Sequence, residues 1–228
     1  MAQIKANEAL VKALQTWNID HLYGIPGDSV DAVVDSLRTV RDQFKFYHVR
    51  HEEVASLAAA SYTKMTGKIG VALSIGGPGI VHLLNGMYDA KMDNVPQLII
   101  AGQTNSTLLG TKFFQETNIS KMVDDVAVYH HQIQKGDNVF EIVNEAIRTA
   151  YEKRGVAVVV CPNDLLTQKI KDTTNRAVDT TKPKPASPKF KSIKKAAKLI
   201  DKAKKPVMLI GLGTQHAKDE LRELIEAA

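Results

Sequence analysis

The order of apolar segments is the feature that most restricts the fold of this chain. Short runs rich in valine and isoleucine alternate with longer segments in which apolar residues recur at helical spacing. Such alternation predicts an α/β fold, a doubly wound parallel sheet flanked by helices on both faces. We expect strands at residues 21–25, 45–49, 69–75, 97–101, 126–133 and 156–160, and helices at residues 7–17, 30–40, 54–65, 80–92, 118–123 and 139–153.

The length of the chain and its proline distribution predict a domain plus a remainder. With 228 residues, 44% of them hydrophobic, the chain can bury a full core. We expect a first domain over residues 1–170, a linker over 171–190 that contains Pro183, Pro185 and Pro188, and an incomplete second α/β domain over 191–228. In that last part we expect helices at residues 193–203 and 217–227 and a strand at 206–210.

Positive charge is concentrated in one segment. Residues 171–205 hold twelve basic and three acidic side chains, a net charge of +9, whereas the whole chain has +5 and the rest therefore −4. Apart from Phe190, no aromatic residue is interleaved to stack on bases, so we interpret these lysines as a solvated helix face and expect no nucleic-acid binding.

The apolar runs and the cysteine content indicate the cellular compartment of the protein. No apolar run approaches bilayer-spanning length and the first residues do not form a signal peptide, so we expect a cytoplasmic protein. The single cysteine, Cys161, lies in an apolar run and is expected to be a buried thiol rather than a nucleophile.

An acidic pair and a glycine-rich loop are expected to share one edge of the sheet. Glu52 and Glu53 stand where a strand ends and a helix begins, and residues 76–79 (Gly-Gly-Pro-Gly) follow the next strand. In open α/β sheets ligands bind at the carboxyl ends of the strands. Neighbouring residues on a helix differ by about a hundred degrees, so only one glutamate can point inward. The alternative for any such pair is that it merely complements the helix dipole.

The glycine-rich loop predicts a site for a flat ring rather than for a phosphate. It lacks the Gly-Lys-Ser/Thr ending of a phosphate loop, and Pro78 removes one amide donor. A close backbone approach to a flat ligand fits better, with His82 and Asn85 on the following helix. A purely structural role for His82 is an equal alternative at this point.

Other motifs carry weaker signals. His48, His51 and Glu52 straddle a strand and a helix, which is not the geometry of a zinc enzyme, so we expect no metal site in these residues. The pair Phe113 and Phe114 predicts one aromatic ring in the core and one at the mouth of the site. Gly211-Leu212-Gly213 lacks the third glycine of a dinucleotide fingerprint.

Several segments of the first domain form one ordered set of motifs, at residues 23–27, 49–53, 58–60, 76–79, 82–86, 88–90, 94–96 and 114–116. Together they resemble the amino-terminal pyrimidine-binding domain of thiamine-diphosphate enzymes, and within that family the pyruvate oxidases. The similarity extends from about residue 4 to 170, and residues 205–213 resemble the start of a central FAD-binding domain. Asp28 stands where we associate glycine with other pyruvate oxidases, which leaves its effect on the substrate pocket open.

The resemblance implies a role for each matching residue. Glu52 would hydrogen-bond the aminopyrimidine ring of thiamine diphosphate and favour the tautomer that removes the thiazolium C2 proton; a carboxyl in a water-poor pocket favours the protonated form that this relay needs. Pyruvate would then be decarboxylated and FAD reduced, with acetyl phosphate or acetate as product. Phe114 and Gln115 would face the substrate. The cofactor-binding residues implied are Pro26, Gly27, Pro78, His82 and Asn85 for the pyrimidine and Gly211 and Gly213 for FAD.

The resemblance also implies partners. Mg²⁺ and the diphosphate would be held by a later domain with a Gly-Asp-Gly and Asn motif, which residues 1–228 lack, so we expect an inactive fragment. In the complete protein a second subunit, in a homodimer or tetramer, would complete the cofactor site. The electron acceptor would be oxygen or a quinone, the latter implying contact with a membrane surface.

Three alternatives stay open at this stage. One is an acetolactate synthase or another thiamine-diphosphate-dependent 2-keto acid decarboxylase, because the glutamate is shared across the family. A second is a non-catalytic binding module of the same fold. A nicotinamide dehydrogenase is more distant, because the glycine fingerprint is absent after the first strand.

Overall fold

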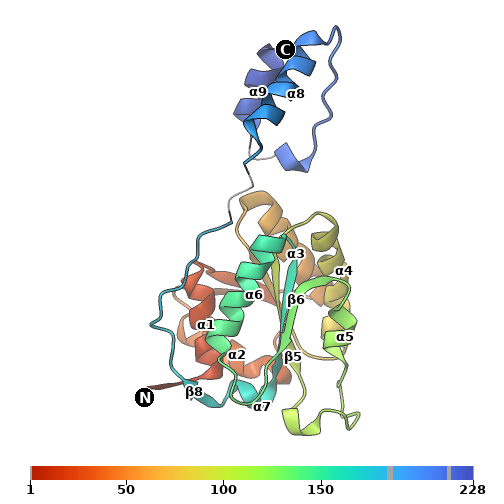
Figure 1. Ribbon diagram of the computed structural model, residues 1–228. Coiled ribbons are helices and arrows are strands. Elements are labelled where there is room, and N and C mark those ends of the chain that lie inside the picture. Colours follow the sequence, from red (N-terminus) through yellow and green to blue (C-terminus); the bar gives the residue numbers. More distant parts are fainter. Residues whose placement is uncertain (1, 184–186, 215–216, 228) are drawn as a thin grey trace. The chain divides into compact units, whose positions relative to one another are not determined.

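A computed structural model describes residues 2–183, 187–214 and 217–227, and they form two compact units, Met1–Pro183 and Lys184–Ala228. The first unit contains a six-stranded sheet in which all neighbours are parallel, in the order β3-β2-β4-β5-β7-β6 (Figure 1). Its strands are β2 (His21–Gly24), β3 (Lys45–His48), β4 (Gly70–Ser74), β5 (Gln97–Gln103), β6 (Ala127–Gln132) and β7 (Val156–Pro162). Its principal helices are α1 (Ala6–Thr16), α2 (Asp31–Thr39), α3 (Glu52–Thr66), α4 (Pro78–Met92), α5 (Ile119–Val123) and α6 (Val139–Lys153). The predicted α/β class is confirmed, and each predicted strand and helix of this unit is present with its ends shifted by at most a few residues.

Helices cover both faces of the sheet, and the strands divide their side chains between them. On β5, Leu98 and Ile100 pack with α1, α2 and α6, whereas Ile99 and Ala101 pack with α3, α4 and α5. The two groups of helices lie on either side of the strands in Figure 1. A central strand with both faces buried explains the continuous apolar runs that predicted a parallel sheet.

The strand order reverses beside β2. The chain moves from β2 outward to β3 and then returns across β2 to β4 on its other side. The carboxyl ends of β2 and β4 therefore flank the topological switch point, where open α/β sheets bind ligands.

Two short strands and a short helix were not predicted. β1 (Gln3–Lys5) pairs antiparallel with β8 (Lys169–Lys171), and α7 (Asn163–Leu166) follows β7. Each of these strands buries one side chain, Ile4 or Ile170, so neither has enough residues to show a period.

Residues 172–183 form a strap that runs along α6. Thr173 Oγ1 accepts a hydrogen bond from Asn138 Nδ2 at 2.8 Å, near the start of α6, and Val178 packs against the core. At the other end Lys182 Nζ donates to the carbonyl oxygen of Gly67 at 2.7 Å and lies over the Tyr151 ring. The first unit therefore includes residues well beyond its last strand.

The second unit contains α8 (Phe190–Lys202), a 3₁₀ turn at Leu212–Thr214 and α9 (Lys218–Ala227). The strand predicted at residues 206–210 is wrong: these residues form no strand, and Val207 and Leu209 are 95% and 99% exposed. A strand needs a hydrogen-bonded neighbour, and the described residues of this unit provide none.

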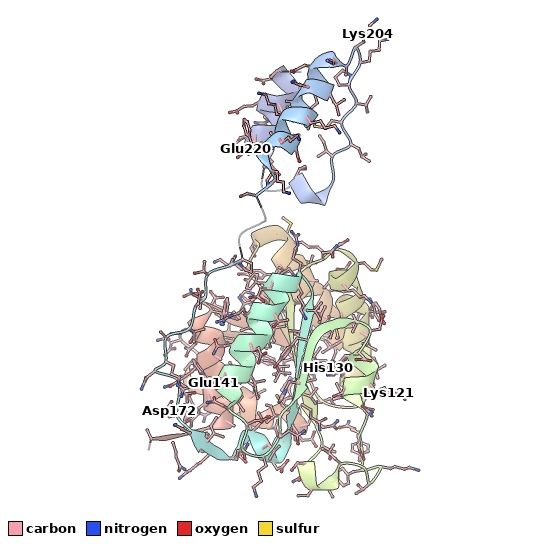
Figure 2. The ribbon with its side chains drawn as sticks, in the orientation of Figure 1. Lys121, His130, Glu141, Asp172, Lys204 and Glu220 are labelled. Carbon is pink, nitrogen blue, oxygen red and sulfur yellow. The ribbon has the colours of Figure 1, made fainter. Side chains whose placement is uncertain are left out.

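Surface helices carry charged side chains outward, as Lys121 on α5 and Glu141 on α6 show (Figure 2). Among the described residues, no helix combines the length and apolar character needed to cross a membrane.

Candidate functional site

Residues at the carboxyl ends of β2, β4 and β5 meet at one edge of the sheet, beside the topological switch point. A Cβ atom added to Gly27, after β2, would lie 2.5 Å from Ile75 Cγ2, after β4. The N–H of Gly76 donates to Ser29 Oγ at 3.1 Å, and a Cβ on Gly76 would lie 3.0 Å from the carbonyl oxygen of Gly102 on β5. The loops that carry Pro26, Gly27 and Pro78 are thus in direct contact.

The two glutamates at the start of α3 face different surroundings. The Glu52 side chain is 12% exposed and its Oε2 lies 2.9 Å from Nδ1 of His82 on α4. The Glu53 side chain is 38% exposed, and its Oε1 accepts a hydrogen bond from Asn85 Nδ2 at 2.9 Å. The prediction that only one of the pair points inward is confirmed, and that residue is Glu52.

His51 completes the surroundings of this acid. It is the N-cap of α3, where its Nδ1 accepts a hydrogen bond from the N–H of Glu53 at 3.3 Å, and its ring stacks on His82 with centroids 4.4 Å apart. Ligand atoms of His51, Glu52 and His82 lie within 4.8 Å of one another, a spacing that could hold a cation. Sequence reasoning considered His48 for such a group, but the third member comes from α4. The expected absence of a metal site stays a prediction.

The glycine-rich loop touches the loop that follows β5. Gly77 has φ of +60°, and a Cβ atom there would lie 2.9 Å from the carbonyl oxygen of Gln115. Only a residue without a side chain allows both that φ and that contact without strain. The backbone of Gln115 is therefore held beside Pro78, the first residue of α4.

The expectation that one of two phenylalanines is buried is wrong. Phe113 and Phe114 are 48% and 76% exposed. The loop is folded around a carboxylate instead of over the core, because both carboxylate oxygens of Glu116 accept backbone hydrogen bonds, from Gly110 at 2.5 Å and Phe113 at 3.1 Å. These bonds, that from Gly110 foremost, hold the pKa of Glu116 below its usual value.

Sequence reasoning assigned no role to two residues of this region, Ser29 and Glu116. Both lay within motifs that had been noted, the turn after the first strand and the Phe-Gln-Glu segment. Nothing in their spacing indicates that their side chains accept backbone hydrogen bonds from residues 47 and 6 positions away.

Three further predicted positions lie elsewhere. Gly211 and Gly213 belong to the second unit, and among the described residues no atom beyond their chain neighbours lies within 4 Å of a Cβ built on either. Cys161 is buried on β7, as expected, and burial raises the pKa of its thiol to about 12.

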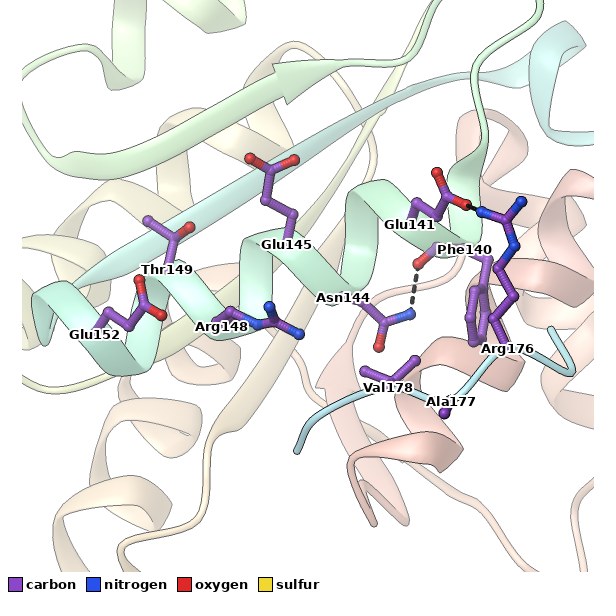
Figure 3. A pocket seen from close by; sticks show the side chains of 10 residues that line it. All are labelled: Phe140, Glu141, Asn144, Glu145, Arg148, Thr149, Glu152, Arg176, Ala177 and Val178. Atoms are coloured by element: carbon purple, nitrogen blue, oxygen red, sulfur yellow. Dashed lines mark hydrogen bonds and ion pairs between the residues drawn. The ribbon is translucent and has the colours of Figure 1, made fainter. Parts of the chain in front are cut away.

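An open groove of about 530 Å³ runs along α6 (Figure 3). It is lined by charged side chains of that helix and by strap residues. The residues that line it are Phe140, Glu141, Asn144, Glu145, Arg148, Thr149, Glu152, Arg176, Ala177 and Val178. None of the predicted site residues contributes to it.

Comparison with known families agrees with the fold and the edge described above. The model of the family "Thiamine pyrophosphate enzyme, N-terminal TPP binding domain" matches residues 4–122, more than half of the chain. The chain belongs to this family of thiamine-diphosphate-dependent enzymes.

Individual relatives carry different names. The chain is 46% identical over 228 residues to the "Putative thiamine pyrophosphate-containing protein YdaP" of Bacillus subtilis, covering 100% of the chain and 40% of that protein. It is 40% identical over 223 residues to the "Pyruvate oxidase" of Lactiplantibacillus plantarum, covering 97% and 37%. It is 34% identical over 228 residues to the "Acetolactate synthase" of Mycobacterium leprae, covering 98% and 36%. The chain thus spans about two fifths of the length of these relatives.

Proposed function

We propose that this chain supplies the pyrimidine-binding domain of a thiamine-diphosphate- and FAD-dependent pyruvate oxidase. The observation that carries the proposal is Glu52, a mostly buried acid at the topological switch point with its carboxylate 2.9 Å from His82. The 40% identity to a protein named pyruvate oxidase supports the choice of pyruvate as substrate. The FAD assignment rests on the resemblance of residues 205–213 to the start of a flavin-binding domain.

The residues at this edge fit a flat heteroaromatic ring. The site offers one carboxylate, one imidazole and a glycine-rich backbone that a side chain at Gly77 would obstruct. When bound, thiamine diphosphate supplies the carbon that attacks the keto group and a ring that accepts the electrons of the broken carbon–carbon bond. Glu52 would exchange a proton with a ring nitrogen, and His82 would hold the Glu52 carboxylate in place. Pro26, Gly27, Pro78 and Asn85 would line the ring, with Phe114 and Gln115 on the substrate side.

An exposed apolar surface beside Glu52 supports a second subunit as partner. Val54, Leu57 and Met65 point outward from α3, and Val81, Tyr88 and Met92 point outward from α4. Exposed apolar residues on two neighbouring helices are typical of a protein–protein interface. We expect a homodimer or tetramer of the complete protein, in which this surface is covered and the diphosphate and Mg²⁺ are held by the other subunit.

Replacement of Glu52 in the complete protein tests the proposed function. Glu52→Gln should slow exchange of the cofactor C2 proton, measured by proton NMR in D₂O, by about 10²–10⁴-fold, the usual contribution of general acid–base catalysis. Glu53→Gln is the matched control, because it changes the adjacent and more exposed glutamate, and it should leave that exchange nearly unchanged. Normal exchange in the Glu52 variant would contradict the proposal.

An acetolactate synthase is the second candidate, supported by the 34% identity to proteins of that name. The two reactions differ in the fate of the electrons. Anaerobic mixing of the complete, FAD-loaded protein with pyruvate should bleach the flavin absorbance if it is an oxidase. Unchanged flavin together with acetolactate formation would favour the second candidate.

A further inference from the structure

The loop of residues 104–118, which carries Phe114 and Gln115, is poorly anchored by packing. Both phenylalanines are exposed, and a cavity of about 560 Å³ lies against the loop, lined in part by Gly110, Lys112 and Glu116. Few apolar contacts therefore fix the conformation of its tip.

The same tip contains unfavourable backbone conformations. Lys112 and Gln115 have φ of +61° and +62°, in the left-handed region that residues with side chains rarely adopt. Such conformations persist only when surrounding interactions impose them. Something other than packing must therefore hold the tip.

The Glu116 carboxylate supplies those interactions. Its Oε1 accepts the N–H of Gly110 at 2.5 Å, and its Oε2 accepts the N–H of Phe113 at 3.1 Å. The N–H of Glu116 in turn donates to the carbonyl oxygen of Phe113 at 2.9 Å. Residues 110–116 are thus closed into a ring around one charged group, and hydrogen bonds to a charged acceptor are stronger than neutral ones.

The geometry points to Glu116 as a positioning residue that holds Phe114 and Gln115 at the substrate side of the site. It acts through the backbone contact between Gln115 and Gly77, where the loop meets the glycine-rich turn. The inference rests on the proposed function, in that the substrate enters at this edge. Glu116 has no direct contact with Glu52 or His82 in this arrangement, so it should affect the substrate step and leave cofactor activation unchanged.

The first test uses this 228-residue chain and amide hydrogen exchange. Glu116→Gln should speed exchange at Gly110 and Phe113 by roughly tenfold, as expected for loss of a charge-assisted hydrogen bond. Glu116→Asp keeps the charge and should give an intermediate effect. Glu152→Gln, an exposed glutamate on α6, is the matched control and should change neither amide. Unchanged exchange at both amides in Glu116→Gln would overturn the positioning role.

The second test uses the complete, cofactor-loaded protein. Glu116→Gln should lower kcat/KM for pyruvate by up to about a hundredfold, the scale of a small misplacement of contacting groups. Exchange of the cofactor C2 proton should stay at the rate of the unmodified protein. Equal losses in both measurements, or in neither, would contradict the inference. A wild-type protein that shows no C2 exchange would instead refute the proposed function, while the amide exchange of the chain would still report on the loop.

Discussion

The Glu52 carboxylate and the His82 imidazole lie 2.9 Å apart, although they stand on separate helices, α3 and α4, and are 30 residues apart in the chain. β4 joins those helices, so the pair is aligned by the sheet and not by local sequence. Its arrangement depends on the same parallel strands that bury the core.

Removal of the imidazole should cost stability. Glu52 is mostly buried, so His82→Phe should lower the free energy of unfolding by about 1 kcal/mol, whereas His82→Gln, which can still donate, should cost less. A double-mutant cycle with Glu52→Gln, followed by urea unfolding, measures the coupling. The control pair is His130 and Asp124, which lie 3.5 Å apart. The Asp124 side chain is 79% exposed, so His130→Gln should have almost no effect. Zero coupling energy between Glu52 and His82 would refute the proposal that His82 holds the Glu52 carboxylate in place.

Alanine at Gly77 should be more harmful than alanine at another glycine of positive φ. Gly77→Ala places a Cβ 2.9 Å from the Gln115 carbonyl oxygen, and we expect a loss of about 1–3 kcal/mol in the free energy of unfolding. Gly136 has φ of +91° with open space around it. Gly136→Ala therefore measures only the loss of unfolding free energy caused by alanine at a positive φ. Equal losses in thermal unfolding of the two variants would mean that the contact with Gln115 contributes nothing.

Acid should release the loop tip before the domain unfolds. Hydrogen bonds from Gly110 and Phe113 lower the pKa of Glu116, so the stabilisation is complete above the usual pKa of 4.5 and is lost as pH falls through the lowered value. The amide chemical shifts of Gly110 and Phe113 should titrate together in this range, while circular dichroism stays constant. In Glu116→Gln that titration should disappear. Its persistence would assign it to another group.

Two truncations should differ in stability. A chain that ends at residue 183 keeps the strap, whereas one that ends at residue 171 loses the bonds of Thr173 and Lys182 and the packing of Val178. We expect the longer form to melt several degrees higher, the shift that about 1 kcal/mol causes in a domain of this size. Similar melting temperatures would place the domain boundary at residue 170, as the sequence indicates.

Periodicity was sufficient to predict the helices but not which side of them is buried. On α3 the large residues Val54, Leu57 and Met65 repeat at helical spacing, yet they are exposed, and the small residues Ala55, Ala59 and Ala60 are buried. The reason is close packing between helices: a Cβ on Gly86 of α4 would lie 2.5 Å from Ser56 and from the Leu57 nitrogen. Hydrophobicity alone does not report such distances.

The meeting of Glu52 with the glycine-rich loop at the carboxyl edge of the sheet could be predicted, because it depends only on where the strands end. The glycine-rich turn and Glu52 both follow strands that run parallel to β2, and their meeting follows from that direction. The conformation of residues 104–118 could not be predicted, because it depends on side-chain-to-backbone hydrogen bonds within a loop. The missing strand at residues 206–210 has a similar cause, since pairing depends on residues distant in the chain.

The strap connects the two opposite edges of the parallel sheet in the first unit. It starts near Asn138, at the edge where the strands end, and reaches Gly67, at the edge where they begin. Lys182 therefore lies at the edge of the sheet opposite to the one that carries Glu52. Within the first unit, the end of the strap therefore leaves the edge that carries Glu52 open to a ligand or to another protein surface.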